Sequence, residues 1–296
     1  VVLFSRAFGV GLVAQLALLT FALEWNEPVF ADARVGNVNR VQLGLLGAGF
    51  AFGLPARGAR ASALGLLLGL GTLLKPNFVL VPAWIAVLLA LRGRFRDLLL
   101  GAAGTLASAL LAVAAAHLGG FDPITWIHWV RAAASMPEAI IRFDLGNVSI
   151  ALALSAMSGV DFVVPLLAAL SLLVAIAIRR GRGRSDEEGL VLAGAALASL
   201  LAARLVWIHY FVLALPAAAA GLRPSASRAS AWTAVGALGL FAVRPLFLVL
   251  GRGDVPLAAG LLNAGAVGLF AATLAELASP SRATPSGGAG TGLEAT

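Results

Sequence analysis

The stretch GLGTLLKPNFVLVP, residues 69–82, places a single charge inside a long apolar region. Lys75 is the only lysine of the chain. It precedes Pro76, which has no backbone N–H and cannot extend the preceding helix. The stretch therefore predicts two short apolar helices, at 62–74 and 78–91, joined by a turn that carries an ammonium group.

The composition indicates that these helices belong to a membrane protein. Of 296 residues, 60% are hydrophobic and 12% are charged, whereas a soluble domain is about 45–50% apolar and about 25% charged. The apolar runs recur and exceed the length of a signal peptide's core. We predict an all-α, polytopic integral membrane bundle with about ten transmembrane segments, each near the ~20 residues that cross a bilayer. The expected segments are 7–23, 40–54, 62–74, 78–91, 98–117, 160–178, 189–203, 207–222, 230–250 and 255–277.

Arginine-rich linkers separate these segments at 55–61, 92–97, 179–184 and 223–228. Cytoplasmic loops carry an excess of Lys and Arg, so we expect the linkers to be cytoplasmic. Two expected segments lie between each linker and the next, as this orientation requires. The chain is then a multi-pass protein of the cytoplasmic (inner) membrane, with a transmembrane domain at 1–278. The Gly-, Ser- and Thr-rich end, 279–296, is expected to be a disordered cytoplasmic tail.

The long loop at 118–159 falls on the outer side in this topology. Apolar residues at helical spacing within 124–134 predict a helix lying flat on the outer membrane interface. A second short helix should follow Gly146, capped by Asn147 or a neighbour.

Several classes of chemistry are disfavoured. The chain has no cysteine, which excludes disulfides and thiolate chemistry, and its three histidines form no HExxH zinc motif. There is no phosphate-binding GK[ST] loop and no GxSxG nucleophile motif. The net charge of +7 comes from arginines between apolar runs, which indicates membrane orientation rather than nucleic-acid binding. Richness in Ala, Leu, Gly and Arg suggests a bacterial source.

Polar clusters on the expected outer side are the candidates for a functional site. Lys75 could bind an anionic phosphate as a point charge, or its ammonium could simply extend to the membrane interface. Asn37 and Asn39 could bind a sugar or phosphate at a helix start, or act as caps.

The remaining candidates lie further along the chain on the same expected face. Asn147 and Ser149 are either ligand contacts or caps. The last cluster contains Arg204, His209 and Tyr210. His209 could carry a proton or be an ordinary buried, hydrogen-bonded histidine, and Tyr210 could be an aromatic anchor at the membrane interface. The shared face of all four clusters favours one common site.

These residues, in this order, resemble membrane glycosyltransferases of the GT-C type, above all glycosyltransferase family 87, the polyprenol-phosphate-mannose-dependent mannosyltransferases. The similarity covers roughly residues 30–222. The departures are Asn37, where the family usually has Gln, and Arg204 and Val206, where it often has Ser-Pro. The stretches that carry the resemblance are GNVN (36–39), ALGLLLGLGTLLKP (63–76), GRFRD (93–97), GNVS (146–149) and VWIHYFVLALP (206–216).

The resemblance implies transfer of a sugar, mannose in the family, from a polyprenyl-phosphate donor to a glycolipid, lipoglycan or protein on the outer face of the membrane. It implies that Lys75, with Arg204 and Arg142, binds the donor phosphate. The partners are the bilayer, the lipid-linked sugar and the acceptor; no cofactor is expected, and metal dependence is open. The residues expected to orient sugar or acceptor are Asn37, Asn39, Asn147, Ser149, His209 and Tyr210.

The family carries its catalytic carboxylate in the first outer loop. The chain starts with Val1 rather than Met, so we expect an N-terminally truncated sequence whose catalytic base lies upstream; Asp32 is the candidate within the chain. The alternative hypothesis is a non-catalytic membrane protein: a transporter or flippase of lipid-linked sugars, or an inactive truncated remnant.

Overall fold

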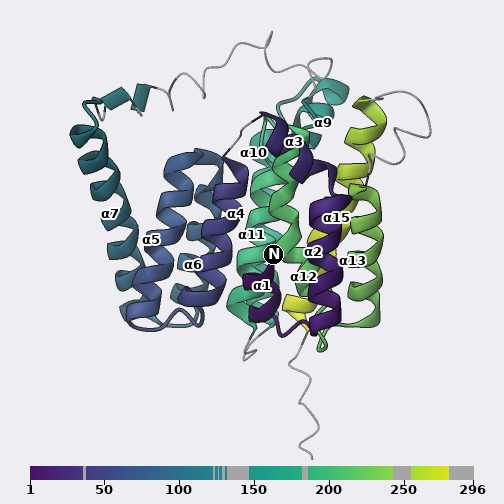
Figure 1. Ribbon diagram of the computed structural model, residues 1–296, viewed down its shortest axis with the longest axis horizontal. Helices are drawn as coiled ribbons and strands as arrows, with labels where there is room; N and C mark the ends of the chain where they lie inside the picture. The colour runs from purple at the N-terminus through teal and green to yellow at the C-terminus, as the bar shows by residue number, and fades with distance from the viewer. Residues whose placement is uncertain are drawn as a thin grey trace, which may run out of the picture.

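The computed structural model describes residues 1–35, 38–122, 124–125, 127–128, 131, 147–181, 186–242 and 255–279. In these ranges every regular element is a helix, apart from one isolated bridge between Asn147 and Trp207. The helices stand side by side in a bundle (Figure 1). They are α1 (Val2–Ala7), α2 (Leu12–Glu24), α3 (Glu27–Val35), α4 (Asn39–Ala48), the π-helix η1 (Gly49–Gly53), α5 (Ala59–Leu74), the 3-10 helix η2 (Pro76–Val79), α6 (Leu80–Leu91), α7 (Phe95–Leu118), α9 (Ile150–Ser158), α10 (Val163–Arg180), α11 (Glu187–Leu201), the 3-10 helix η4 (Ile208–Ala214), α12 (Leu215–Gly221), α13 (Arg228–Phe241) and α15 (Val255–Ala278).

Helix α11 forms the centre of the bundle. Its sequence, EEGLVLAGAALASLL, is rich in Gly, Ala and Ser, and all of its residues except Glu188 are buried. Small side chains let neighbouring helix backbones approach closely. Helices α6, α10, α12 and α15 pack around α11, so this segment holds the two sides of the molecule together.

The predicted all-α membrane bundle is confirmed. Three helices are long and apolar enough to cross a membrane, namely α7, α10 and the Leu257–Ala278 part of α15. Shorter apolar helices accompany them at Leu12–Glu24, Ala59–Leu74, Leu80–Leu91 and Ile208–Gly221. Large apolar side chains on α7, such as Leu99, Leu106 and Leu110, are exposed, as expected for contact with lipid. The number of ten crossings stays a prediction.

Basic linkers meet at one end of the bundle. Arg94 pairs with Asp97 and Glu188, and Arg223 lies 2.9 Å from Asp186 and 2.7 Å from Glu276. The opposite end carries α3 and α9 (Figure 1). Which end faces the cytoplasm stays a prediction.

Two of the expected segments differ from the structure near the N-terminus. The expected crossing at 7–23 is broken, because α1 ends at Ala7 and Gly9 adopts a left-handed φ of 66° before α2 begins. The expected loop at 24–39 contains α3. Asn26 caps that helix by accepting a hydrogen bond from the Val29 N–H at 3.1 Å, and Pro28 stands in its first turn, which is a known start signal.

The short helix expected after Gly146 is α9, and its cap is the neighbour of Asn147 at position 149. The Ser149 side chain accepts a hydrogen bond from the Leu152 N–H. Only residues 124–125, 127–128 and 131 of the expected interfacial helix are described, and residues 280–296 of the expected tail lie outside the described residues.

Helices α5 and α7 are in close backbone contact. A Cβ atom on Gly65 would lie 2.0 Å from the Gly101 carbonyl oxygen, and one on Gly104 would lie 2.0 Å from that of Ser62. The Thr105 hydroxyl donates to the Gly65 carbonyl across the interface at 3.1 Å. Glycine is therefore required at these positions for the two helices to pack as they do.

We expect Gly65→Ala to destabilise the protein by about 1–3 kcal/mol, because overpacking a tight contact forces the helices apart. Gly101→Ala is the matched control, since its Cβ would meet only the Ala61 carbonyl at an ordinary 3.6 Å. The thermal unfolding midpoint of each purified variant in detergent gives the comparison. Equal midpoints for the two variants would contradict the close-packing account.

Candidate functional site

Lys75 is held at the end of α5 by its neighbour in sequence. The helical conformation is disfavoured for a residue before proline, and Lys75 accordingly has an extended backbone with φ −149° and ψ 116°. Pro76 then starts η2. The ring of Phe78 in η2 packs over Gly71 of α5, where a Cβ would lie 2.9 Å from it. The chain thus turns sharply and projects the lysine from the helix end.

The ammonium of Lys75 has two partners in the described residues. Its Nζ donates a hydrogen bond to Asn39 Oδ1 at 2.8 Å. It also lies over the ring of Tyr210, 3.6 Å from the centroid, which is a cation–π contact. The side chain as a whole is partly exposed. The ammonium is therefore fixed in direction, in a residue that is only partly buried.

Asn39 connects this cation to a buried carboxylate. It stands at the first position of α4 and is buried. Its Nδ2 donates to Asp32 Oδ1 at 2.9 Å and to the His209 carbonyl at 3.4 Å. One amide thus joins α3, α4, the α5 end and η4.

Asp32 is fully buried, and both of its oxygens accept hydrogen bonds. Oδ1 accepts from Asn39, and Oδ2 accepts from the backbone N–H of Arg40 at 3.2 Å and from its Nε at 2.9 Å. The Arg40 side chain is half exposed. This cluster contains two cations, Arg40 and Lys75, and one carboxylate, Asp32. The net charge of the three side chains is therefore one positive charge.

The protonation state of Lys75 follows from its surroundings. Lys75 lies in the turn between α5 and η2, outside both helices. Burial lowers the pKa of its ammonium to about 8, while the Asp32 carboxylate acts in the opposite direction. The amine of Lys75 is therefore mostly protonated at neutral pH.

Asn147 and Ser149 hold the segment that leads into η4. Asn147 Oδ1 accepts from the N–H groups of Ser149 and Val206, and its Nδ2 donates to the Arg204 carbonyl at 3.1 Å. The Ser149 hydroxyl donates to the Ala203 carbonyl at 2.6 Å. Both side chains are buried. They fix the approach to His209 and Tyr210 rather than facing the ammonium.

The structure thus brings together part of the predicted set. Lys75, Asn39 and Tyr210 are in direct contact, and the His209 ring stacks edge-on against Tyr210 with centroids 5.0 Å apart. Arg204 is exposed in the segment before η4. Asn37 and Arg142 lie outside the described residues.

Gln42, which lies one helical turn from Asn39, is not among the residues predicted from the sequence. It is fully buried, and its Nε2 donates to the Gly71 carbonyl at 2.9 Å. Its Oε1 is buried without a partner in the described part of the chain. The three-residue spacing from Asn39 puts both amides on one face of α4, a signal that could have identified it. In the same part of the chain, no group of three or more His, Asp or Glu side chains comes together that could hold a metal ion.

The fold and this polar cluster define an α-helical polytopic membrane protein with a cationic group at one end. Residues 1–203 match the family model of glycosyltransferase family 87. This match covers more than half of the chain, and the chain belongs to glycosyltransferase family 87. The matched range contains Asp32, Asn39 and Lys75, whereas His209 and Tyr210 follow it. A comparison with curated proteins and one with solved structures found no match.

The contact between Lys75 and Tyr210 can be measured by substitution. We expect Tyr210→Leu to cost about 0.5–2 kcal/mol of stability through loss of the cation–π contact. Tyr210→Phe keeps the ring and serves as the control. The measurement is the thermal unfolding midpoint, repeated in a Lys75→Gln background. A Tyr210→Leu loss that is equally large in both backgrounds would show that the ring acts only by packing.

Proposed function

We propose that this family 87 protein transfers a sugar from a polyprenyl-phosphate donor to a hydroxyl of a glycolipid, lipoglycan or protein. The sugar we propose is mannose, on the resemblance to polyprenol-phosphate-mannose-dependent enzymes. We place the reaction on the outer face of the cytoplasmic membrane. Family membership supports glycosyl transfer, and the Lys75 cluster supports a donor with a phosphate.

The single observation that carries the proposal is the ordered ammonium of Lys75, a residue that is only partly buried. Asn39 and Tyr210 fix it in direction, so part of the entropy cost of ordering a lysine is already met before a ligand binds. The group with Asp32 and Arg40 keeps one positive charge, which favours an anion. A lipid phosphate is an anion that naturally lies at the depth where a membrane helix ends.

The proposed chemistry uses this charge on the leaving group. The bond between the anomeric carbon and the phosphate oxygen breaks, and negative charge develops on the lipid phosphate. A preorganised cation in a partly dry site stabilises that charge. The acceptor oxygen forms the new glycosidic bond and gives its proton to a carboxylate base. Lys75 takes the phosphate role, and Arg204 and Arg142 are proposed to assist it.

We assign Asp32 a positioning role. Both of its oxygens are occupied by Asn39 and Arg40, and its side chain is fully buried, so it acts on the ligand through Asn39 and Lys75. Asn37, Asn39, His209 and Tyr210 are proposed to orient the sugar or acceptor.

Asn147 and Ser149, which we had expected to contact sugar or acceptor, are instead proposed to shape the wall of the site. Their polar atoms are engaged with the backbone of 203–206, which leads into η4. Their substitution should therefore disturb the site through the position of Tyr210.

We expect Lys75→Ala to lower kcat/KM for sugar transfer about 100-fold or more, the size of effect seen when a charge-stabilising group is removed. Lys75→Arg should keep part of the activity, because it retains the charge in a different geometry. The measurement is transfer of radiolabelled sugar from polyprenyl-phosphate mannose in membranes that contain the protein.

Arg228→Ala is the control for general loss of charge, since this exposed arginine lies in α13 near the opposite end. It should leave transfer unchanged. Full activity of both Lys75 variants would refute the phosphate role. Failure of the full-length protein to transfer from any of several lipid-phosphate sugars would refute the proposed donor.

A further inference from the structure

Helix α4 contacts the Lys75 turn at two points. Asn39, at the first position of α4, accepts a hydrogen bond from the Lys75 ammonium at 2.8 Å. Gln42, one helical turn later, donates from its Nε2 to the Gly71 carbonyl of α5 at 2.9 Å. Residues three positions apart lie on the same face of a helix. One face of α4 therefore holds both the tip of the lysine and the backbone that leads to it.

The Gly71 carbonyl lies where Lys75 leaves α5. It also accepts a hydrogen bond from the backbone N–H of Lys75, the residue that follows the helix, at 3.3 Å. N–H···O bonds are usually about 2.9–3.0 Å long, so this last helical bond is weak and the Gln42 bond is the shorter of the two. A carbonyl oxygen has two lone pairs and can accept both donors. Gln42 therefore fixes the carbonyl from which the lysine turn departs.

The ring of Phe78 contacts the same glycine. A Cβ atom on Gly71 would lie 2.9 Å from that ring, which places η2 directly against the end of α5. Phe78 is itself buried, and its N–H donates to the Lys75 carbonyl at 3.0 Å. The backbone of Lys75 is thus bonded on both sides, through its N–H to Gly71 and through its carbonyl to Phe78. A shift of the Gly71 carbonyl is expected to displace Lys75 through these contacts.

Stability alone does not explain an amide at position 42. The Gln42 side chain is fully buried, and its Oε1 has no partner among the described residues. A buried polar atom without a partner costs at least as much as one hydrogen bond typically contributes. A methionine or a leucine would fill the same position without that cost. The bond from Gln42 to the Gly71 carbonyl, beside the lysine turn, accounts for the amide instead.

We infer that Gln42 is a positioning residue for Lys75: by holding the Gly71 carbonyl, its amide sets the point at which the ammonium meets an anionic group of the ligand. The inference rests on the proposed function, which supplies that anion. It adds that α4 places Lys75 through two amides, one on the ammonium and one on the backbone. Loss of the second amide then moves the cation without removing it.

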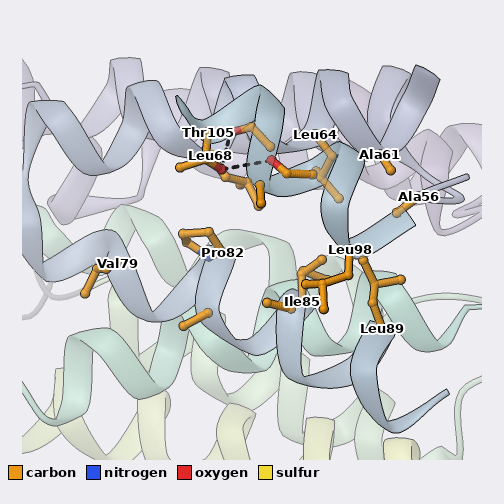
Figure 2. Close-up of a pocket in the computed structure, with 15 residues that line it drawn as sticks. Ala56, Ala61, Leu64, Leu68, Val79, Pro82, Ile85, Leu89, Leu98 and Thr105 are labelled. Carbon is orange, nitrogen blue, oxygen red and sulfur yellow. Dashed lines mark hydrogen bonds between the residues drawn. The ribbon is translucent and has the colours of Figure 1, made fainter. Parts of the chain in front are cut away.

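The test compares two apolar substitutions with a matched control. Gln42→Met keeps the length of the side chain and removes the donor together with the unpaired oxygen, so we expect the thermal unfolding midpoint to change little. Gln42→Leu repeats the test with a second apolar side chain. Thr105→Val is the control, because the Thr105 hydroxyl also donates to a carbonyl of α5, that of Gly65, at 3.1 Å. Figure 2 marks the hydrogen bonds of Thr105 with dashed lines.

The pKa of the Lys75 ammonium reports its placement without any need for activity. Protein labelled with ¹³C at the lysine Cε gives one lysine NMR signal, because the chain has one lysine, and the shift of that signal follows protonation. The wild type should titrate with a pKa of about 8. Burial lowers this pKa, so a turn freed by Gln42→Met should raise it toward 10.5, by about 1 pH unit. The other charged or titratable groups around the amine are the same in every variant: Asp32, Arg40, His209 and Tyr210.

Two results of the titration would overturn the inference. A pKa that stays at about 8 in both Gln42 variants would show that Lys75 keeps its place without the amide. An equal rise of the pKa in Thr105→Val would show that the loss of any contact to α5 has the same effect.

Sugar transfer by the full-length protein gives a second readout. We expect Gln42→Met to lower kcat/KM about tenfold, because a displacement of about 1 Å can cost up to about 100-fold. In a Lys75→Ala background the same substitution should cause no further loss, since Gln42 acts through the lysine. An equal loss in both backgrounds would overturn the inference, because Gln42 would then act independently of Lys75.

The two readouts separate this inference from the proposed function. If the unsubstituted full-length protein transfers sugar from no lipid-phosphate donor, the proposed function is refuted. The pKa difference between Gln42→Met and Thr105→Val then still decides whether the amide places the lysine. Normal transfer by Gln42→Met together with an unchanged pKa overturns the positioning role and leaves the proposed function intact.

Discussion

The contact between Lys75 and Asn39 is the interaction on which the polar end of this protein depends. The amide accepts from the ammonium on one side and donates to the Asp32 carboxylate on the other. It thereby joins the consecutive helices α3 and α4 to the end of α5 and to η4, which lie further along the chain. It also links a cation to a buried carboxylate without direct contact between the two charges. A charge without such partners is costly at membrane depth. The polar network therefore both stabilises this end of the bundle and holds the Lys75 ammonium in a fixed direction.

Much of the fold follows from apolar run length and from proline and arginine positions. The runs at 62–74, 98–117 and 160–178 correspond closely to α5, α7 and α10. Helix α3 was missed because a short helix with charged and polar residues among its apolar ones has no long apolar run. The break between α1 and α2 was missed because it depends on the backbone conformation of Gly9, which an apolar sequence conceals.

The site was predictable in part for a different reason. Alternation of helices with short loops puts Lys75, Asn39 and Tyr210 at the same end, so their grouping could be anticipated. Other features depend on tertiary contacts, which leave no periodic signal in the sequence. They are the pairing of Asp32 with Asn39, the burial of Gln42, and the use of Asn147 to hold a loop in place. Residue type alone does not show which partners an amide has. The structure shows that Asn39 joins Lys75 to Asp32, whereas Asn147 bonds to the backbone of Arg204 and Val206.

The presence of one lysine in 296 residues has a practical consequence. Apart from the amino terminus, Lys75 carries the chain's one primary amine, and it is partly exposed in the middle of the polar cluster. An amine-directed reagent would modify the intact protein at a single internal position without any engineered cysteine. The rate of that modification then reports how far other molecules cover the polar cluster. It can be measured in a membrane and needs no substrate assay.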